Sequence, residues 1–343
     1  MYMKRKDQIQ VNQLSEGTKT SMKVRIISSI IAICIAVPAV LLGDWFFVGL
    51  IFILTLVGAR EIINCAKPKH SHWLTVIAAI IILLLTFWPI LRFLVSPDKV
   101  TDWTLYGSFE TIYLSIFVLA LGFLSLFWMV ICDSQFSVKD ACFVFTIGLV
   151  LALGFQSLLV VRFAPIYEHF YLLEGNVDTS YFSVFKNLSS SSLAFYIAVA
   201  TFMTDAGAYF VGVFFGKHKM NPRISPKKTW EGFFGGIIIS TVVSFLFAII
   251  LALTGNPILQ IFDIDHWYLI LILSLIIPVF STLGDLVFSS LKRHYDIKDF
   301  GKLIPGHGGV LDRVDSLLFA GIVSAIFISF VLAIYYGKGI PLL

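Results

Sequence analysis

Five polar residues in the last third of the chain are spaced so that their side chains would meet. Asp285, Ser289 and Lys292 fall at positions i, i+4 and i+7, which lie on one face of a helix. Asp312 and Asp315 are three residues apart and share a face in the same way. Carboxylates, together with water and phosphate oxygens, are the usual ligands of Mg²⁺ in proteins. The spacing therefore predicts two acidic helix ends that hold a divalent cation.

The segment between these two groups is rich in glycines and cations. Gly306, Gly308 and Gly309 permit a backbone that turns its N–H groups toward an anion. His307, which lies among them, is either a phosphate donor or a proton carrier, although a loop histidine more often has neither role. The cations of the segment and its ends are Lys292, Arg293, Lys298, Lys302 and Arg313. We interpret the segment as a cradle for an anionic phosphate compound.

A second basic segment, residues 217–231, precedes an apolar stretch. It contains Ser225, Lys227, Lys228 and Thr229 close to the point where a helix would begin. The backbone N–H groups at a helix N-terminus favour anions. A loop that is basic only because it faces the cytosol is the competing explanation.

Asp205 lies in the middle of another apolar stretch. A carboxylate at the centre of a membrane helix costs about 2.5–3.5 kcal/mol. Asp205 therefore faces a polar cavity, a cation or a partner, and a protonated side chain that bonds another helix is the structural alternative.

The composition indicates that these residues are carried by membrane helices. Of the 343 residues, 58% are hydrophobic and only 13% are charged, whereas a soluble domain has about 25% charged residues. The mean hydropathy is +0.91. These values exclude a soluble enzyme and predict an all-α, polytopic membrane protein. With about 20 residues per span, we expect about nine transmembrane helices, at 26–43, 45–59, 73–95, 111–131, 141–161, 191–216, 232–254, 267–291 and 316–337.

The distribution of cations predicts the orientation in the membrane. Lys and Arg gather in cytosolic loops, and nine spans with a cytosolic N-terminus place most of the 25 Lys and Arg residues inside. The C-terminus is then outside. We expect a cytosolic tail at 1–25, N-terminal transmembrane helices at 26–190 and a catalytic transmembrane region at 191–343. The cations left outside are Arg92, Lys99, Arg162, Lys186 and Lys338.

The residues alone predict a membrane phosphotransfer or nucleotidyl-transfer site, which takes an anionic compound from the cytosol and a partner from the bilayer. A cation- or proton-coupled transporter that uses Asp205 and Asp285 is the alternative from another class. Transporters often have two halves of similar design. Here the polar residues crowd into one third of the chain and one face of the bilayer, which favours the enzyme.

The same segments resemble the signature of the phosphatidate cytidylyltransferases, also called CDP-diacylglycerol synthases. The matching signature positions lie within 289–293, 298–301 and 304–315, and further similar blocks lie at 204–209, 225–232 and 284–286. Over the first 190 residues the resemblance rests only on hydropathy. Phe288 departs from the pattern, because many members have a glutamate there.

The resemblance implies transfer of CMP from CTP to phosphatidate, which gives CDP-diacylglycerol and pyrophosphate and requires Mg²⁺. Asp285 and Asp312 match the metal-binding positions, and K⁺ is implied as a second cation. Asp315 and Asp205 are further candidates for metal binding or substrate orientation. The expected catalytic residues beside the two metal ligands are Lys292, Arg293 and His307. The expected substrate-binding residues are Ser225, Lys227, Lys228, Thr229, Lys298, Gly308, Gly309 and Arg313.

The resemblance also suggests the protein's surroundings. The expected partners are CTP, phosphatidate and the lipid bilayer, with no nucleic acid and with a second copy of the chain as a homodimer. The expected location is the plasma membrane, crossed several times, with the active site toward the cytosol. A polyprenol or phytol kinase that also uses CTP is the nearest rival, and the group gained by the lipid product separates the two.

Overall fold

The computed structural model describes residues 16–66, 72–95, 109–134, 136–172 and 191–336. Most of them are helical. The elements are α1 (Glu16–Leu42), α2 (Asp44–Ala66), α3 (His72–Val95), α4 (Phe109–Cys132), α5 (Val138–Leu172), α6 (Ser192–Phe215), β1 (Lys219–Asn221), β2 (Ser225–Thr229), α7 (Trp230–Leu253), α8 (Trp267–His294) and α9 (Leu311–Tyr336).

The predicted class, a helical polytopic membrane protein, is confirmed. Within the described ranges, seven helices are long and apolar enough to span a membrane, namely α1, α2 and α5 to α9. The apolar described parts of α3 and α4 are shorter, at Thr75–Trp88 and Leu119–Cys132. Most of the predicted cytosolic tail and the C-terminal end, whose sides of the membrane were predicted, lie outside the described residues.

The basic segment 217–231, expected as a loop, contains a short antiparallel hairpin instead. Lys219 pairs with Thr229, and Asn221 pairs with Ser225. The Asn221 side chain accepts a hydrogen bond from the Ile224 N–H at 3.2 Å, which is the asparagine-stabilised turn that such residues favour. Thr229 then ends β2 and caps α7, because its hydroxyl accepts the Gly232 N–H at 3.1 Å.

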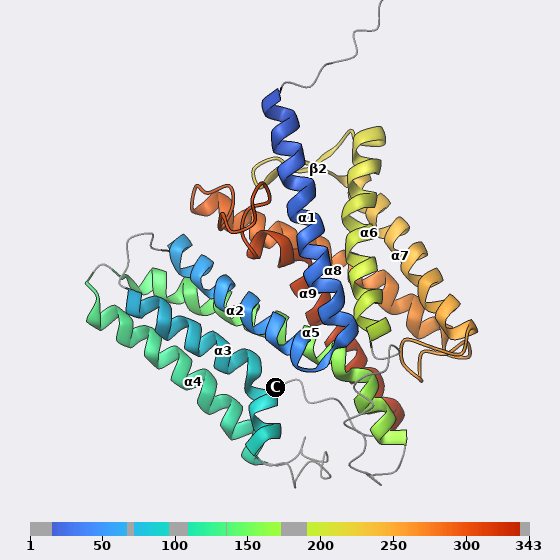
Figure 1. Cartoon of the computed structure of the whole chain (residues 1–343), viewed down its shortest axis with the longest axis horizontal. Helices are drawn as coiled ribbons and strands as arrows, with labels where there is room; N and C mark the ends of the chain where they lie inside the picture. Colours follow the sequence, from blue (N-terminus) through green and yellow to red (C-terminus); the bar gives the residue numbers. More distant parts are fainter. Residues whose placement is uncertain (1–15, 67–71, 96–108, 135, 173–190, 337–343) are drawn as a thin grey trace, which may run out of the picture.

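The helices form two groups joined through α8 and α9 (Figure 1). α2 and α3 pack on α5 with α4 beside them, and α6 packs along α7 on the other side of the molecule. α5 and α8 both pack on α9, so α9 links the two groups. The closeness of α6 and α7 depends on glycines, because a Cβ at Gly236 would lie 2.8 Å from the Thr204 carbonyl oxygen. Small residues permit this approach between membrane helices.

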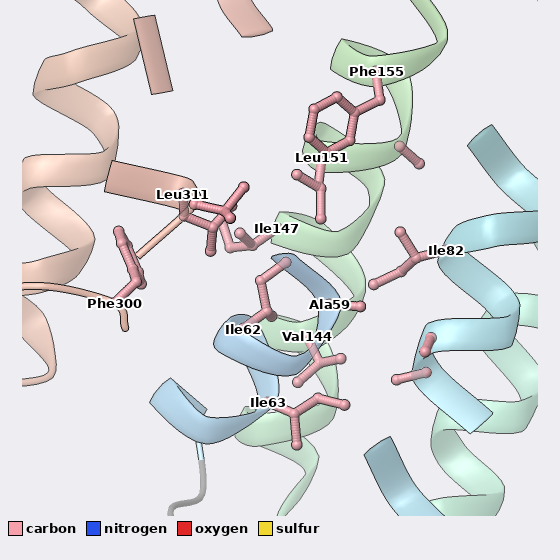
Figure 2. Close-up of a cluster of buried hydrophobic side chains, with 14 of the residues drawn as sticks. Ala59, Ile62, Ile63, Ile82, Val144, Ile147, Leu151, Phe155, Phe300 and Leu311 are labelled. Carbon is pink, nitrogen blue, oxygen red and sulfur yellow. The ribbon is translucent and has the colours of Figure 1, made fainter. Parts of the chain in front are cut away.

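One apolar core joins the N-terminal helices to the segment before α9 (Figure 2). Ile62 of α2 and Ile147 of α5 lie in the same cluster as Phe300 and Leu311. All four side chains are buried. The start of α9 is therefore packed against helices more than 150 residues earlier in the chain.

Candidate active site

Asp285 forms an ion pair with a lysine of the hairpin. Its Oδ2 atom lies 2.5 Å from the Lys228 Nζ, and both side chains are about one quarter exposed, at 28% and 25%. Ser289, one turn later on α8, donates a hydrogen bond to Asp285 Oδ1 at 3.2 Å. The predicted shared face is thus confirmed for these two residues. The pairing with Lys228 depends on the hairpin, which folds the basic segment back over the end of α8.

Asp312 is held by three donors at the start of α9. Its Oδ1 lies 2.9 Å from the Lys292 Nζ. Its Oδ2 accepts backbone N–H groups from Phe300 at 2.8 Å and Gly309 at 2.9 Å. The Asp312 side chain is only 2% exposed. A buried carboxylate is tolerated when its charge is paired and its oxygens accept hydrogen bonds. Lys292 pairs the charge of Asp312, and the two backbone N–H groups bind its other oxygen.

Gly308 is required by this arrangement. Its φ is +91°, a conformation that side-chain-bearing residues rarely adopt. A Cβ at this position would also lie 2.8 Å from Asp312 Oδ2. The glycine-rich segment therefore closes around an aspartate of the protein itself, which the sequence did not predict.

Two further carboxylates lie close enough to Asp285 for their negative charges to repel it. The charges of Asp205 on α6 and Asp315 on α9 both interact repulsively with Asp285. Lys228 and Arg313 act on Asp205 with the opposite sign. Lys292 has the same favourable effect on Asp315. Three helices thus bring acidic groups and cations into one region, as the sequence predicted for α8 and α9.

The donor chemistry of this region fits a hard divalent cation. In the described part of the chain, no group of three or more His, Cys, Asp or Glu side chains is arranged to hold a metal. Mg²⁺, however, is commonly held by one or two carboxylates together with substrate phosphates and water. Asp285 and Asp312 each form an ion pair with a lysine ammonium group, so each carboxylate already binds a cation. For this reason these two stay the candidate metal ligands, and Asp205 and Asp315 are the further candidates.

The two predicted arginines contact neighbouring backbone. Arg293 Nε donates to the Ile224 carbonyl oxygen in the hairpin turn at 3.3 Å. Arg313 Nε donates to the His307 carbonyl oxygen at 3.1 Å. Both are exposed residues, Arg293 near the end of α8 and Arg313 near the start of α9, so an incoming phosphate can reach their side chains.

His307 lies against α1. Its Nδ1 is 2.7 Å from the Ser28 hydroxyl, and its Nε2 is 3.2 Å from the Ser29 hydroxyl. Both ring nitrogens are thus engaged away from the carboxylates described above. The predicted roles of His307 as a phosphate donor or proton carrier stay predictions, and they require these contacts to be exchanged.

The remaining predicted substrate residues lie in the hairpin and in the segment before α9. The hydroxyl of Thr229 is used in capping α7. Lys227 and Lys298 are exposed, and Ser225 is half-buried at the start of β2. Gly309 gives its N–H to Asp312. Their contacts with substrate stay predictions.

Tyr295, directly after α8, anchors the segment that leads to α9. Its ring packs on Phe143 of α5, with centroids 4.5 Å apart. Burial raises the pKa of Tyr295 to about 12. A tyrosine is neutral at physiological pH even at its ordinary pKa of about 10, and the packing on Phe143 makes this ring an anchor for the segment.

Glu61 of α2 was not predicted from the sequence. It is only 5% exposed, and its carboxylate accepts the backbone N–H groups of Val310 and Leu311, each at 2.9 Å. The available signal was a carboxylate within an apolar run that continues through Ile62 and Ile63.

Comparisons with known proteins place the chain in a family. Residues 23–331 match the sequence model of the cytidylyltransferase family. The chain is 30% identical over 301 residues to a phosphatidate cytidylyltransferase of Staphylococcus haemolyticus (strain JCSC1435), covering 87% of this chain and 95% of that protein. It is 40% identical over 209 residues to a phosphatidate cytidylyltransferase of Bacillus subtilis (strain 168), covering 57% and 73%. The chain belongs to the cytidylyltransferase family.

Proposed function

We propose that this protein transfers CMP from CTP to phosphatidate, giving CDP-diacylglycerol and pyrophosphate. The observation that carries the proposal is the presence of two carboxylate–lysine pairs, Asp285 of α8 with Lys228 of the hairpin and Asp312 of α9 with Lys292 of α8, on apolar helices that pack together. The names of the relatives from Staphylococcus haemolyticus and Bacillus subtilis support the same reaction.

The reaction brings together two anions that repel each other. A phosphate oxygen of phosphatidate attacks the α-phosphorus of CTP, and the bond from that phosphorus to the oxygen bridging to the β-phosphorus breaks. The electron pair leaves with pyrophosphate. No protein nucleophile is required, so catalysis consists of positioning and charge neutralisation. Lys228, Lys292, Arg293 and Arg313 supply the positive charge in this proposal.

Asp285 and Asp312 are the proposed ligands of Mg²⁺, with Asp205 and Asp315 adding negative potential around them. Bound by these residues, a divalent ion would supply charge neutralisation for the phosphates. Lys228 and Lys292 already lie on these carboxylates. We propose that both ammonium groups move to phosphate oxygens when substrate binds. A K⁺ ion as second cation and a homodimer stay predictions from the resemblance.

The protein is a multi-pass membrane protein, and we propose that it lies in the plasma membrane with the site facing the cytosol. Large apolar side chains on α6, including Phe202, Phe210 and Phe214, are more than half exposed and suit contact with lipid tails. In a cysteine-free background, a cysteine replacing exposed Lys302 should react with an impermeant maleimide only after the cells are opened. Labelling in intact cells would reverse the proposed orientation.

The experiment that tests the reaction uses purified protein, phosphatidate, Mg²⁺ and CTP labelled on either the α- or the γ-phosphate. We expect α-label in the lipid product and γ-label in pyrophosphate. Transfer of γ-label to a polyprenol or phytol would identify a CTP-dependent kinase instead. Flux of an ion across liposomes without consumption of CTP would revive the transporter.

Lys228→Ala is expected to raise the apparent KM for CTP or phosphatidate by about 10- to 100-fold, because a charge-assisted hydrogen bond contributes about 1.5–3 kcal/mol. Lys219→Ala is the matched control, since Lys219 is an exposed lysine of the same hairpin. Saturation curves for both substrates provide the measurement. Curves equal to those of the unchanged protein would mean that Lys228 serves only to orient the loop.

A further inference from the structure

Glu61 is a buried carboxylate that the transfer chemistry described above does not use. It lies near the end of α2, about 250 residues before the segment it contacts. Its Oε1 accepts the N–H of Val310 at 2.9 Å, and its Oε2 accepts the N–H of Leu311 at 2.9 Å. Both oxygens are therefore bound to the two residues that directly precede Asp312.

The electrostatics of a helix end explain why a carboxylate is stable there. The first N–H groups of a helix have no partner within the helix and carry a partial positive charge. Glu61 accepts hydrogen bonds from two N–H groups at the start of α9, and the same bonds satisfy its own buried oxygens. It therefore acts as an N-terminal cap that is supplied by a different helix.

The segment before α9 is shaped to admit this carboxylate. A Cβ added at Gly301 or at Gly309 would collide with the carboxylate of Glu61. Gly309 also donates its N–H to Asp312. The segment is thus fastened by two carboxylates, Asp312 from its own helix and Glu61 from α2.

The position of Glu61 is set by the apolar core. The adjacent residues Ile62 and Ile63 are at most 1% exposed. They belong to the cluster that also contains Leu311 and Ile147 (Figure 2). Since close-packed cores deform little, the carboxylate is presented to α9 from a fixed support.

We propose that Glu61 is a positioning residue for the transfer reaction. By fixing the backbone of Val310 and Leu311, it sets the direction in which the next two residues, Asp312 and Arg313, face the phosphates. The expected effect on CMP transfer rests on the proposed function. The fixing of the Val310 and Leu311 backbone rests on the two hydrogen bonds alone. In this proposal the N-terminal helices contribute to the reaction, because α2 positions a part of the site.

Glu61→Gln tests the inference with little change of shape. The amide keeps one acceptor but turns an N–H₂ group toward a backbone N–H, so one of the two hydrogen bonds is lost. We expect CMP transfer per folded molecule to fall about 10- to 100-fold, as is usual when a group supporting a metal ligand is removed. The half-saturating Mg²⁺ concentration should rise about tenfold for the same reason. Hydrogen–deuterium exchange at the amides of Val310 and Leu311 should become faster.

Two further variants separate positioning from general stability. Thr55→Val is the matched control, because Thr55 is buried on the same helix and its hydroxyl donates to the Ile51 carbonyl oxygen of that helix at 2.7 Å. It should leave the Mg²⁺ dependence unchanged. Gly301→Ala pushes a methyl group against the Glu61 carboxylate, and it should reproduce the altered Mg²⁺ dependence.

The outcomes distinguish this inference from the proposed function. If the unchanged protein makes the labelled lipid and Glu61→Gln keeps its turnover and Mg²⁺ dependence, the positioning role is wrong. A variant that gives less folded protein but has a normal Mg²⁺ dependence would make Glu61 merely structural, which also overturns the inference. If Glu61→Gln does not fold, Gly301→Ala decides. An unchanged protein that transfers no CMP refutes the proposed function, and faster exchange in Glu61→Gln would then still demonstrate the contact.

Discussion

Asp285→Asn is expected to lower CMP transfer by about 1000-fold, the size of effect seen when a group that stabilises transition-state charge is removed. Asparagine keeps the shape of the side chain but loses the charge that holds Lys228 and attracts the cation. The fold should be kept, since the substitution also removes the repulsion of Asp285 with Asp205 and Asp315. Turnover of purified protein with labelled CTP measures the first effect, and thermal unfolding in detergent measures the second.

Asp263→Asn is the matched control for this prediction. Asp263 lies just before α8, where its carboxylate bonds the backbone N–H and the ring of His266. The same chemical change at the other end of the helix should leave transfer nearly unaffected. Near-normal turnover in Asp285→Asn would remove that carboxylate from the proposed metal site.

Asp312→Asn is expected to lower both transfer and stability. Transfer should fall about 100- to 1000-fold, because a second charged group is lost from the site. In addition, Asp312 accepts two backbone N–H groups and a lysine in a buried position. Loss of hydrogen bonds to a charged group costs about 1.5–3 kcal/mol each, so the melting temperature in detergent should fall as well.

The contrast between the two aspartates is itself informative. Asp285→Asn should lose activity without losing stability, whereas Asp312→Asn should lose both. A stable Asp312→Asn protein with normal turnover would show that the contacts of Asp312 with Phe300 and Gly309 do not position a catalytic group.

Local spacing predicted much of the fold and part of the site. The helices follow from runs of apolar residues, and α9 begins at Leu311, five residues before the predicted span, so Asp312 and Asp315 lie within it. The shared face of Asp285 and Ser289 follows from helical periodicity. These features depend on residues that are neighbours in the sequence, so a sequence pattern contains them.

The missed features depend on contacts between distant segments. Glu61 acts on residues about 250 positions away, and the packing of both α2 and α9 on α5 brings it there. The contacts of the His307 ring with Ser28 and Ser29 of α1 were not predicted, and the predicted roles of His307 stay predictions. The space that Gly308 leaves for Asp312 was likewise not predicted, and the phosphate cradle stays a prediction. Residue type alone does not state which partner occupies such a space.

The most direct test of the central claim is a crystal structure with CTP and Mn²⁺ in place of Mg²⁺, because anomalous scattering locates the metal without reference to the protein density. We expect a metal peak in contact with the carboxylates of Asp285 and Asp312 and with the triphosphate. A metal ion held by the triphosphate alone, with both of these aspartates still bound only to lysines and backbone N–H groups, would contradict it.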